Sequence, residues 1–63
     1  MMHAIIDTDG TRLVYWGIGE TEEAARCDAE EQEGYEETEH NATAEISDML
    51  AREIDRGAIV VVS

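Results

Sequence analysis

Two short runs rich in apolar residues lie on either side of a turn signal within the first sixteen positions, a pattern that is typical of two strands joined by a tight turn. Residues 4–7 and 12–16 form the two strand-like runs, and Asp9-Gly10 between them favours a two-residue hairpin turn. This turn predicts that Ile6 lies opposite Leu13. The other predicted pairs follow the same register and are Asp7 with Arg12, Ile5 with Val14 and Ala4 with Tyr15.

Because successive side chains of a strand point to opposite faces, the predicted hairpin has two different faces. The face that we expect to lie in the core carries Ala4, Ile6, Leu13 and Tyr15. The other face carries His3, Ile5, Asp7, Arg12, Val14 and Trp16. We interpret Trp16 as a core residue, since the chain has only three aromatic side chains with which to fill a core.

A helix is predicted directly after the hairpin. Thr21 followed by two glutamates is typical of a capped helix start, and Gly34 is a natural left-handed end. The first helix is therefore expected to run to Glu33. Tyr35, just beyond the end, is expected to fold back over Ala29.

A second helix is predicted over about residues 42–56, with Gly57 as its end, because apolar residues recur there at helical spacing. The members of this stripe, which we expect in the core, are Ile46, Met49, Leu50 and Ile54. The apolar run 58–62 closes the chain as a strand that is expected to be at least partly covered.

These elements predict one small α+β domain over residues 1–63, in the order β-β-α-α-β, with a three-stranded sheet and two helices packed on one face. The last strand can lie antiparallel to the second strand or parallel to the first, and the sequence leaves both arrangements open. Such a sheet would leave Ile5, Val14 and Trp16 on an uncovered face. A homodimer or another partner is then an alternative cover for that face.

The chain is strongly acidic, and the acids are concentrated in one segment. It holds 16 Asp and Glu against four Arg and no Lys, which gives a formal net charge of −12. Residues 20–39 contain ten of these acids and one Arg, a net charge of −9, so the rest of the chain contributes −3. On a helical wheel, Arg26 is the one cation on the outward side of the first predicted helix. Like charges at helical spacing destabilise a helix by about 0.2–0.5 kcal/mol per pair, so this cluster adds no stability.

This composition argues against several classes of function. Carboxylates repel phosphates, so we expect no direct binding of nucleic acid. No apolar run approaches the roughly 18 residues of a membrane span, and no basic start precedes an apolar signal core, so we expect a cytoplasmic protein without a membrane partner. His3, Cys27 and His40 lack metal-ligand spacing, and so small a core can hardly enclose a catalytic pocket. We therefore predict no metal, no cofactor and no enzyme activity.

The spacing of the acids resembles that of phosphates. Helical rise of about 1.5 Å per residue gives one carboxylate per roughly 3 Å over residues 20–39, close to the 3.4 Å per phosphate along one DNA strand. A protein surface lined with Lys and Arg could accept such a face, so the predicted partner is a basic nucleic-acid-binding protein or complex. The predicted partner-binding residues are Glu20, Glu22, Glu23, Glu30, Glu31, Glu33 and Glu37.

The run GIGETEEAA at residues 17–25 and the acids after it resemble the small acidic inhibitors that bacteriophages encode, especially anti-CRISPR proteins. The resemblance lies in size, isoelectric point and layout over the whole chain. Members of that group bind a CRISPR effector complex, and several occupy the surface meant for DNA. The resemblance implies contact with Lys and Arg of a Cascade-type complex, in the cytoplasm of the host cell, through Glu22, Glu23, Glu30, Glu31 and Glu33.

Two alternatives remain open from the sequence. In the first, the acidic and Lys-free surface belongs to a halophile's protein and serves a high-salt solvent in place of a partner. In the second, the chain is a small structural or assembly module that uses Trp16 and the open sheet face.

Overall fold

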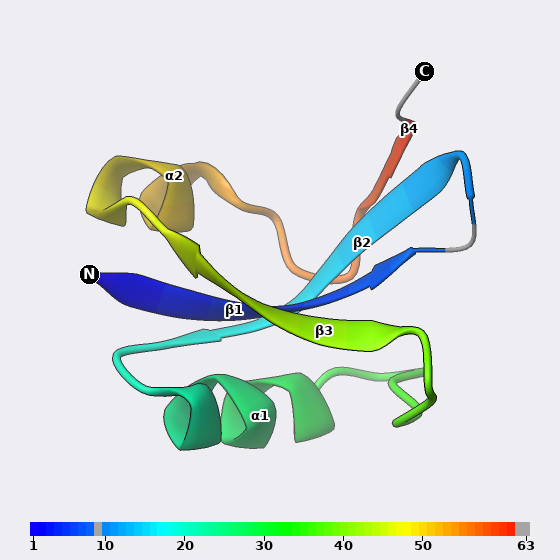
Figure 1. Ribbon diagram of the computed structural model, residues 1–63, viewed down its shortest axis with the longest axis horizontal. Helices are drawn as coiled ribbons and strands as arrows, with labels where there is room; N and C mark the ends of the chain where they lie inside the picture. The colour runs from blue at the N-terminus through cyan, green and yellow to red at the C-terminus, as the bar shows by residue number, and fades with distance from the viewer. Residues whose placement is uncertain (9, 62–63) are drawn as a thin grey trace.

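Four antiparallel strands form a sheet that separates two short helices, α1 on one face and α2 on the other (Figure 1). The computed structural model describes residues 1–8 and 10–61. The elements in chain order are β1 (Met2–Thr8), β2 (Arg12–Gly19), α1 (Glu22–Glu30), β3 (Asn41–Ile46), α2 (Asp48–Glu53) and β4 (Ile59–Val61). The strand order across the sheet is β3-β1-β2-β4, and every neighbouring pair is antiparallel.

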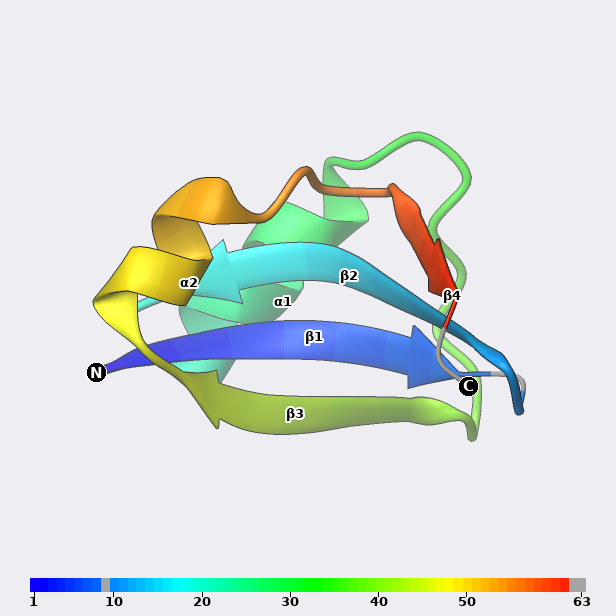
Figure 2. The same cartoon turned by 90° about the horizontal axis from the view of Figure 1, so that it is seen from above.

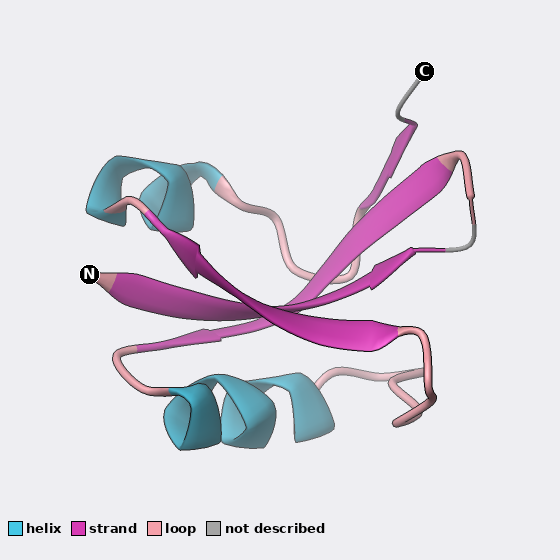
Figure 3. Cartoon of the chain, in the orientation of Figure 1, coloured by secondary structure: helices cyan, strands magenta, loops and turns pink. Residues whose placement is uncertain are grey.

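The predicted three-stranded sheet with both helices on one face is wrong, because the segment predicted to begin the second helix is a strand. Residues 41–46 pair with the outer edge of β1, from Asp7 opposite Asn41 to Met2 opposite Ile46 (Figure 3). The order is therefore β-β-α-β-α-β. Ala42, Ala44 and Ile46 also recur at the two-residue period of a strand, so the pattern permitted a helix or a strand. Pairing with β1 makes this segment a strand.

The second helix is consequently short, and its predicted apolar stripe is only partly buried. Ser47 caps α2, since its Oγ accepts a hydrogen bond from the Leu50 amide at 3.1 Å. Ile46 is buried and Ile54 is half-buried, but Leu50 is exposed and Met49 is 73% exposed. The prediction that all four residues lie in the core is wrong for Met49 and Leu50.

The hairpin of β1 and β2 exists, but in a different register. Its pairs are offset by two residues from the predicted ones, with Thr8 opposite Leu13 and Ile6 opposite Tyr15, and a bulge follows before Ile5 pairs with Gly17. An offset of two preserves the faces, so Ile6 and Tyr15 still lie on the same side. Asp9 of the predicted turn lies outside the described residues.

The bulge places α1 against a strip of β2 without side chains. A Cβ atom on Gly17 would overlap the Ala25 carbonyl oxygen, and a Cβ on Gly19 would overlap the backbone of Ala24 and Ala25. The backbone of α1 thus lies almost in contact with the backbone of β2, which needs small residues on both elements. This close approach fixes which side of α1 faces the sheet.

Two small apolar clusters hold the layers together. Ile5, Ala25 and Ala29 form the cluster under α1, while Ala4, Ile18 and Ile46 form the cluster under α2. Trp16 and Tyr35 pack against the first cluster, with their ring centroids 5.7 Å apart and at 65°. The expected fold-back of Tyr35 after the left-handed Gly34 is confirmed. The expected exposure of Ile5 on an uncovered face is wrong, because α1 covers it.

The last strand pairs antiparallel with β2, which is one of the two arrangements that the sequence allowed. The backbone N–H of Gly57 donates to the Tyr15 carbonyl oxygen at 2.8 Å and leads the chain onto this edge. The expected cover over this strand is not found, since Ile59, Val60 and Val61 are all exposed.

Candidate acidic interface

The outer side of α1 and the loop after it carry the predicted partner-binding residues. Thr21 begins the helix, and its Oγ1 accepts a hydrogen bond from the Ala24 amide at 3.1 Å. Because Ala25 and Ala29 face the sheet, the glutamates of the helix face outward. We call the exposed carboxylates of this surface the acidic ridge; its members are Glu20, Glu22, Glu23, Glu30, Glu31, Glu33 and Glu37. All seven predicted residues are exposed and lie on one connected stretch of chain.

One member of the ridge is paired with a cation. Arg26 lies 3.4 Å from Glu37, measured from Nη1 to Oε1, and both side chains are more than half exposed. The sequence placed Arg26 between Glu22 and Glu30, whereas the structure pairs it with a loop residue. In the described part of the chain, the other six ridge carboxylates form no ion pair. The ridge therefore keeps most of its charge uncompensated.

The inward acid of α1 has a different role. The Oδ2 atom of Asp28 accepts a hydrogen bond from the backbone N–H of Ile18 at 2.9 Å and lies 2.7 Å from Nε of Arg56. The position of Asp28 on the apolar side of its helix predicts a structural partner, either a backbone donor or Arg52; the donor is confirmed, while the cation is Arg56. Asp28 thus joins α1, β2 and the segment before β4, and it does not belong to the ridge.

The end of α1 carries acids where a helix disfavours them. The last helical residue is Glu30, Glu31 is the C-cap, Glu33 follows in the turn, and the last turn holds no basic residue. The C-terminal end of a helix has a partial negative charge, so an acid there destabilises the helix by about 0.3–1 kcal/mol at low ionic strength. The acids at this end of the ridge therefore lower the stability of α1 and do not contribute to it.

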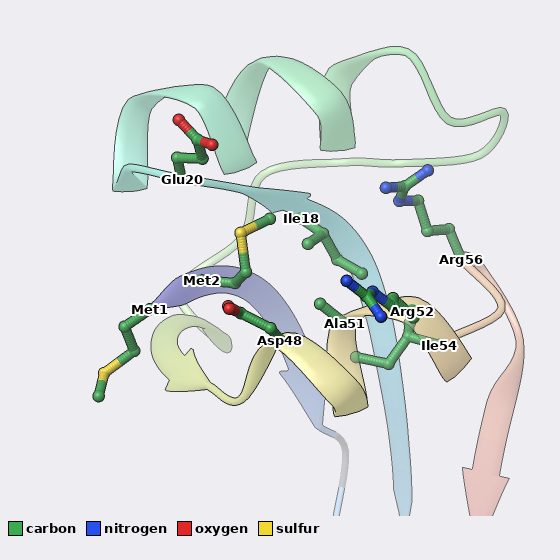
Figure 4. A pocket seen from close by; sticks show the side chains of 9 residues that line it. All are labelled: Met1, Met2, Ile18, Glu20, Asp48, Ala51, Arg52, Ile54 and Arg56. Carbon is green, nitrogen blue, oxygen red and sulfur yellow. The ribbon is translucent and has the colours of Figure 1, made fainter.

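A hollow of about 750 Å³ lies between α2 and the far end of β2 (Figure 4). Apolar side chains of β1, β2 and α2 line part of it, and the charged side chains around it are Glu20, Asp48, Arg52 and Arg56. Two acids and two arginines give this hollow no net charge. Glu20 thus lies where the ridge meets a neutral region, and the concentrated charge belongs to α1 and its following loop.

The described residues show no group of three or more His, Cys, Asp or Glu side chains that could hold a metal ion. His3 lies in β1, Cys27 is exposed on α1, and His40 lies in the loop before β3. Within the same ranges, no helix has the length and hydrophobicity needed to cross a bilayer. The absence of a metal, a cofactor and enzyme activity, which the sequence analysis expects, stays a prediction.

Comparison of the chain with protein-family models, with curated proteins and with solved structures finds no match.

Sequence reasoning missed two features that shape the site. The Arg26–Glu37 pair joins a helix to a loop, and its members are eleven positions apart, so no helical spacing rule predicts it. The Asp28–Arg56 pair joins α1 to the segment before β4, so its members are distant in the sequence. The sequence did indicate that Asp28 needs a partner, because it is the one acid on the apolar side of its helix, but it did not identify Arg56 as the cation.

Proposed function

We propose that this protein is an inhibitor that binds a nucleic-acid-binding protein through the acidic ridge and occupies the surface meant for phosphates. The observation that carries the proposal is the end of α1, where Glu30, Glu31 and Glu33 are exposed, unpaired with any described cation and placed at the negative end of the helix. A small fold gains no stability from this arrangement. Binding to a basic surface supplies a reason for it.

The geometry supports mimicry of a short stretch of one strand. Five ridge carboxylates lie between Glu22 and Glu33, which at about 1.5 Å per residue is one charge per roughly 3–4 Å. Phosphates along one DNA strand are spaced by about 3.4 Å. Averaged over this stretch, the ridge has a charge density close to that of about five phosphates, with two carboxylates at the start of α1 and three at or beyond its end. Lysines and arginines that hold a backbone would make charge-assisted hydrogen bonds to it.

The particular target that we propose is a CRISPR effector of the Cascade type, and this choice rests on the resemblance to anti-CRISPR proteins alone. Such an inhibitor acts in the cytoplasm, which is that of the host cell if a phage encodes it. The wider proposal does not depend on that target, because any Lys- and Arg-lined phosphate site offers the same chemistry.

Two variants with equal change of charge test the proposal. In the ridge variant, Glu30, Glu31 and Glu33 are replaced by Gln. In the control variant, the replacements are Glu45→Gln, Glu53→Gln and Asp55→Asn, three exposed acids outside the ridge. The net charge of each variant becomes less negative by three units, so a general effect of net charge appears equally in both.

The measurement is inhibition of DNA binding by a Cascade-type effector, together with capture of basic proteins from host lysate in the presence and absence of excess duplex DNA. We expect the ridge variant to lose inhibition by more than tenfold and the control variant to keep it. Captured proteins should be released by duplex DNA and by added salt. Equal inhibition by both variants would reject the proposal.

The halophile alternative gives a different outcome in the same preparation. A surface that serves a high-salt solvent predicts cooperative unfolding only in molar salt, with little native protein in dilute buffer. An inhibitor with a partner predicts a folded chain in dilute buffer. Circular dichroism at low and high salt separates the two before any target is known.

A further inference from the structure

The face of the sheet that carries α2 holds no charged side chain at any described strand position. Alternation along each strand and the observed registers place its side chains as Met2, Ala4, Ile6, Thr8, Leu13, Tyr15, Ile18, Ala42, Ala44, Ile46 and Val60. The acidic and basic residue types in the strands all point to the α1 face; they are His3, Asp7, Arg12 and Glu45. Such a separation is typical of a face that is meant to be covered.

The helix on that face is too short to cover it. The six residues of α2 span about 9 Å, whereas the seven residues of β1 span about 23 Å. Figure 2 shows α2 over one end of the sheet, with the other end uncovered from above. We call this uncovered part the open sheet face, and its members are Ile6, Thr8, Leu13, Tyr15, Ala42, Ala44 and Val60.

The exposure of these residues agrees with an uncovered end of the sheet. Ile6, Leu13 and Tyr15 lie in the central strands and yet are only half-buried, Ala42 is exposed, and Val60 is 44% exposed. The accessible surface of the whole molecule is 4454 Å². A folded monomer of 7.0 kDa is expected to expose about 4,000 Å², so this fold exposes more surface than a compact monomer of its mass.

We propose that the open sheet face is the interface of a homodimer, in which two copies pack sheet against sheet about a two-fold axis. Among residues 1–8 and 10–61, the buried apolar core consists of six residues, three of them alanine, and small folds with so little core commonly gain stability through oligomers. A second copy supplies the missing layer, and two sheets pack in this way at about 10 Å and about 30°. Self-packing buries no charge, because the face has none.

The distribution of charge permits a second copy as the occupant, because the uncharged open sheet face lies opposite the acidic ridge. Two chains with a net charge of −12 repel, and any contact through α1 would bring two acidic ridges together. Packing through the open sheet face puts both α1 helices on the outer sides, with two sheets between them (Figure 1). The ridges are then separated by more than the Debye length of about 8 Å at physiological salt, so their repulsion is largely screened.

Two neighbouring positions on β3 give a matched test. Ala42 and Thr43 are adjacent and exposed, but Ala42 points to the open sheet face while Thr43 points to the other face. An Ala42→Arg variant places a charge in the interface without changing the core. A Thr43→Arg variant makes the same addition on the opposite side and serves as the control.

Sedimentation equilibrium over roughly 1 µM to 1 mM measures the association. We expect the native chain and Thr43→Arg to dimerise with the same dissociation constant, and Ala42→Arg to raise that constant more than tenfold. Dilution should also shift the amide NMR signals of Ile6, Leu13 and Val60 while leaving those of α1 unchanged.

Each other result overturns the proposal. A monomer throughout the range removes the dimer itself, equal weakening by both variants indicates pairing through the edge of β3, and no effect of Ala42→Arg places the contact elsewhere. The proposal does not rest on the acidic ridge: the Glu30, Glu31 and Glu33 ridge variant should dimerise as the native chain does.

Discussion

The two sides of the sheet show opposite solutions to the same problem of covering an apolar surface. On one side, α1 lies almost in backbone contact with Gly17 and Gly19, and it carries an outer surface of acids. On the other side, α2 covers one end only, and the strand positions around it hold no charge. The first side is covered by α1 over Ile5, although Ile59 and Val61 at its β4 edge stay exposed, and its outer surface is open to a charged partner. The second side is covered at one end only and is open to an apolar partner.

This comparison separates two kinds of surface that net charge alone would merge. A net charge of −12 indicates a protein that stays apart from its own copies. The position of the charge changes that conclusion, because the ridge and the open sheet face lie on opposite sides (Figure 1). One surface can repel other copies while the other remains available to them.

The largest effect is expected where α1 meets β2. Gly17→Ala adds a Cβ that overlaps the carbonyl oxygen of Ala25 and the backbone of Ala29, so the helix must move away from the sheet. We expect a loss of about 3 kcal/mol or more in the free energy of unfolding, measured by urea denaturation. Thr43→Ala, on the same face at an exposed position, should change it by less than about 0.5 kcal/mol. A Gly17→Ala protein of native stability would mean that α1 is not held so close.

The next effect concerns the inward acid of the same helix. Asp28→Ala leaves the Ile18 N–H and the Arg56 guanidinium without their shared acceptor, and we expect a loss of about 1–3 kcal/mol by thermal or urea unfolding. Asp28→Asn keeps an oxygen for the Ile18 N–H and should lose less. Glu23→Ala, an exposed ridge position without a described ion pair, is the control and should be close to neutral. Equal losses for Ala and Asn would assign the effect to the charge alone.

The α2 side predicts a contrast between two residues that the sequence treated alike. Ile54 packs against the cluster of Ala4, Ile18 and Ile46, whereas Met49 is 73% exposed. Ile54→Ala should therefore lower the free energy of unfolding by about 1–2 kcal/mol, less than for a fully buried site. Met49→Ala should change it by less than about 0.5 kcal/mol. Comparable losses would support the long helix that the apolar stripe predicted.

Local signals in the sequence predicted the elements whose partners are near in the chain. The hairpin follows from two apolar runs around one turn, and the start of α1 follows from the Thr21 cap. The predicted end at Glu33 is wrong, because the helix ends at Glu30, before the left-handed Gly34. The ridge was predicted because helical periodicity separates the inward alanines from the outward acids. These features depend on spacing alone.

Features that depend on distant partners were not predictable in the same way. Residues 41–46 satisfy both helical and strand periods, and only the free edge of β1 makes them a strand. The hairpin register depends on the bulge at Trp16 and Gly17, which lets α1 approach β2. Pairing of Arg26 with Glu37 likewise depends on how the loop returns after α1. In each case tertiary contact selects among states that the local sequence allows.

The smallest effect separates stability from function on the α1 side. Glu33→Gln removes one negative charge beyond the C-terminal end of α1, so the free energy of unfolding should rise by a few tenths of a kcal/mol at low ionic strength. The gain should disappear near 1 M salt, where the Debye length falls to about 3 Å. Glu45→Gln, an exposed acid of β3 that lies outside both helices, is the control for loss of an exposed acid. If Glu33→Gln is more stable and inhibits less, the charge is maintained for a partner; if it is less stable, the ridge contributes to the fold and the reason for a basic partner is lost.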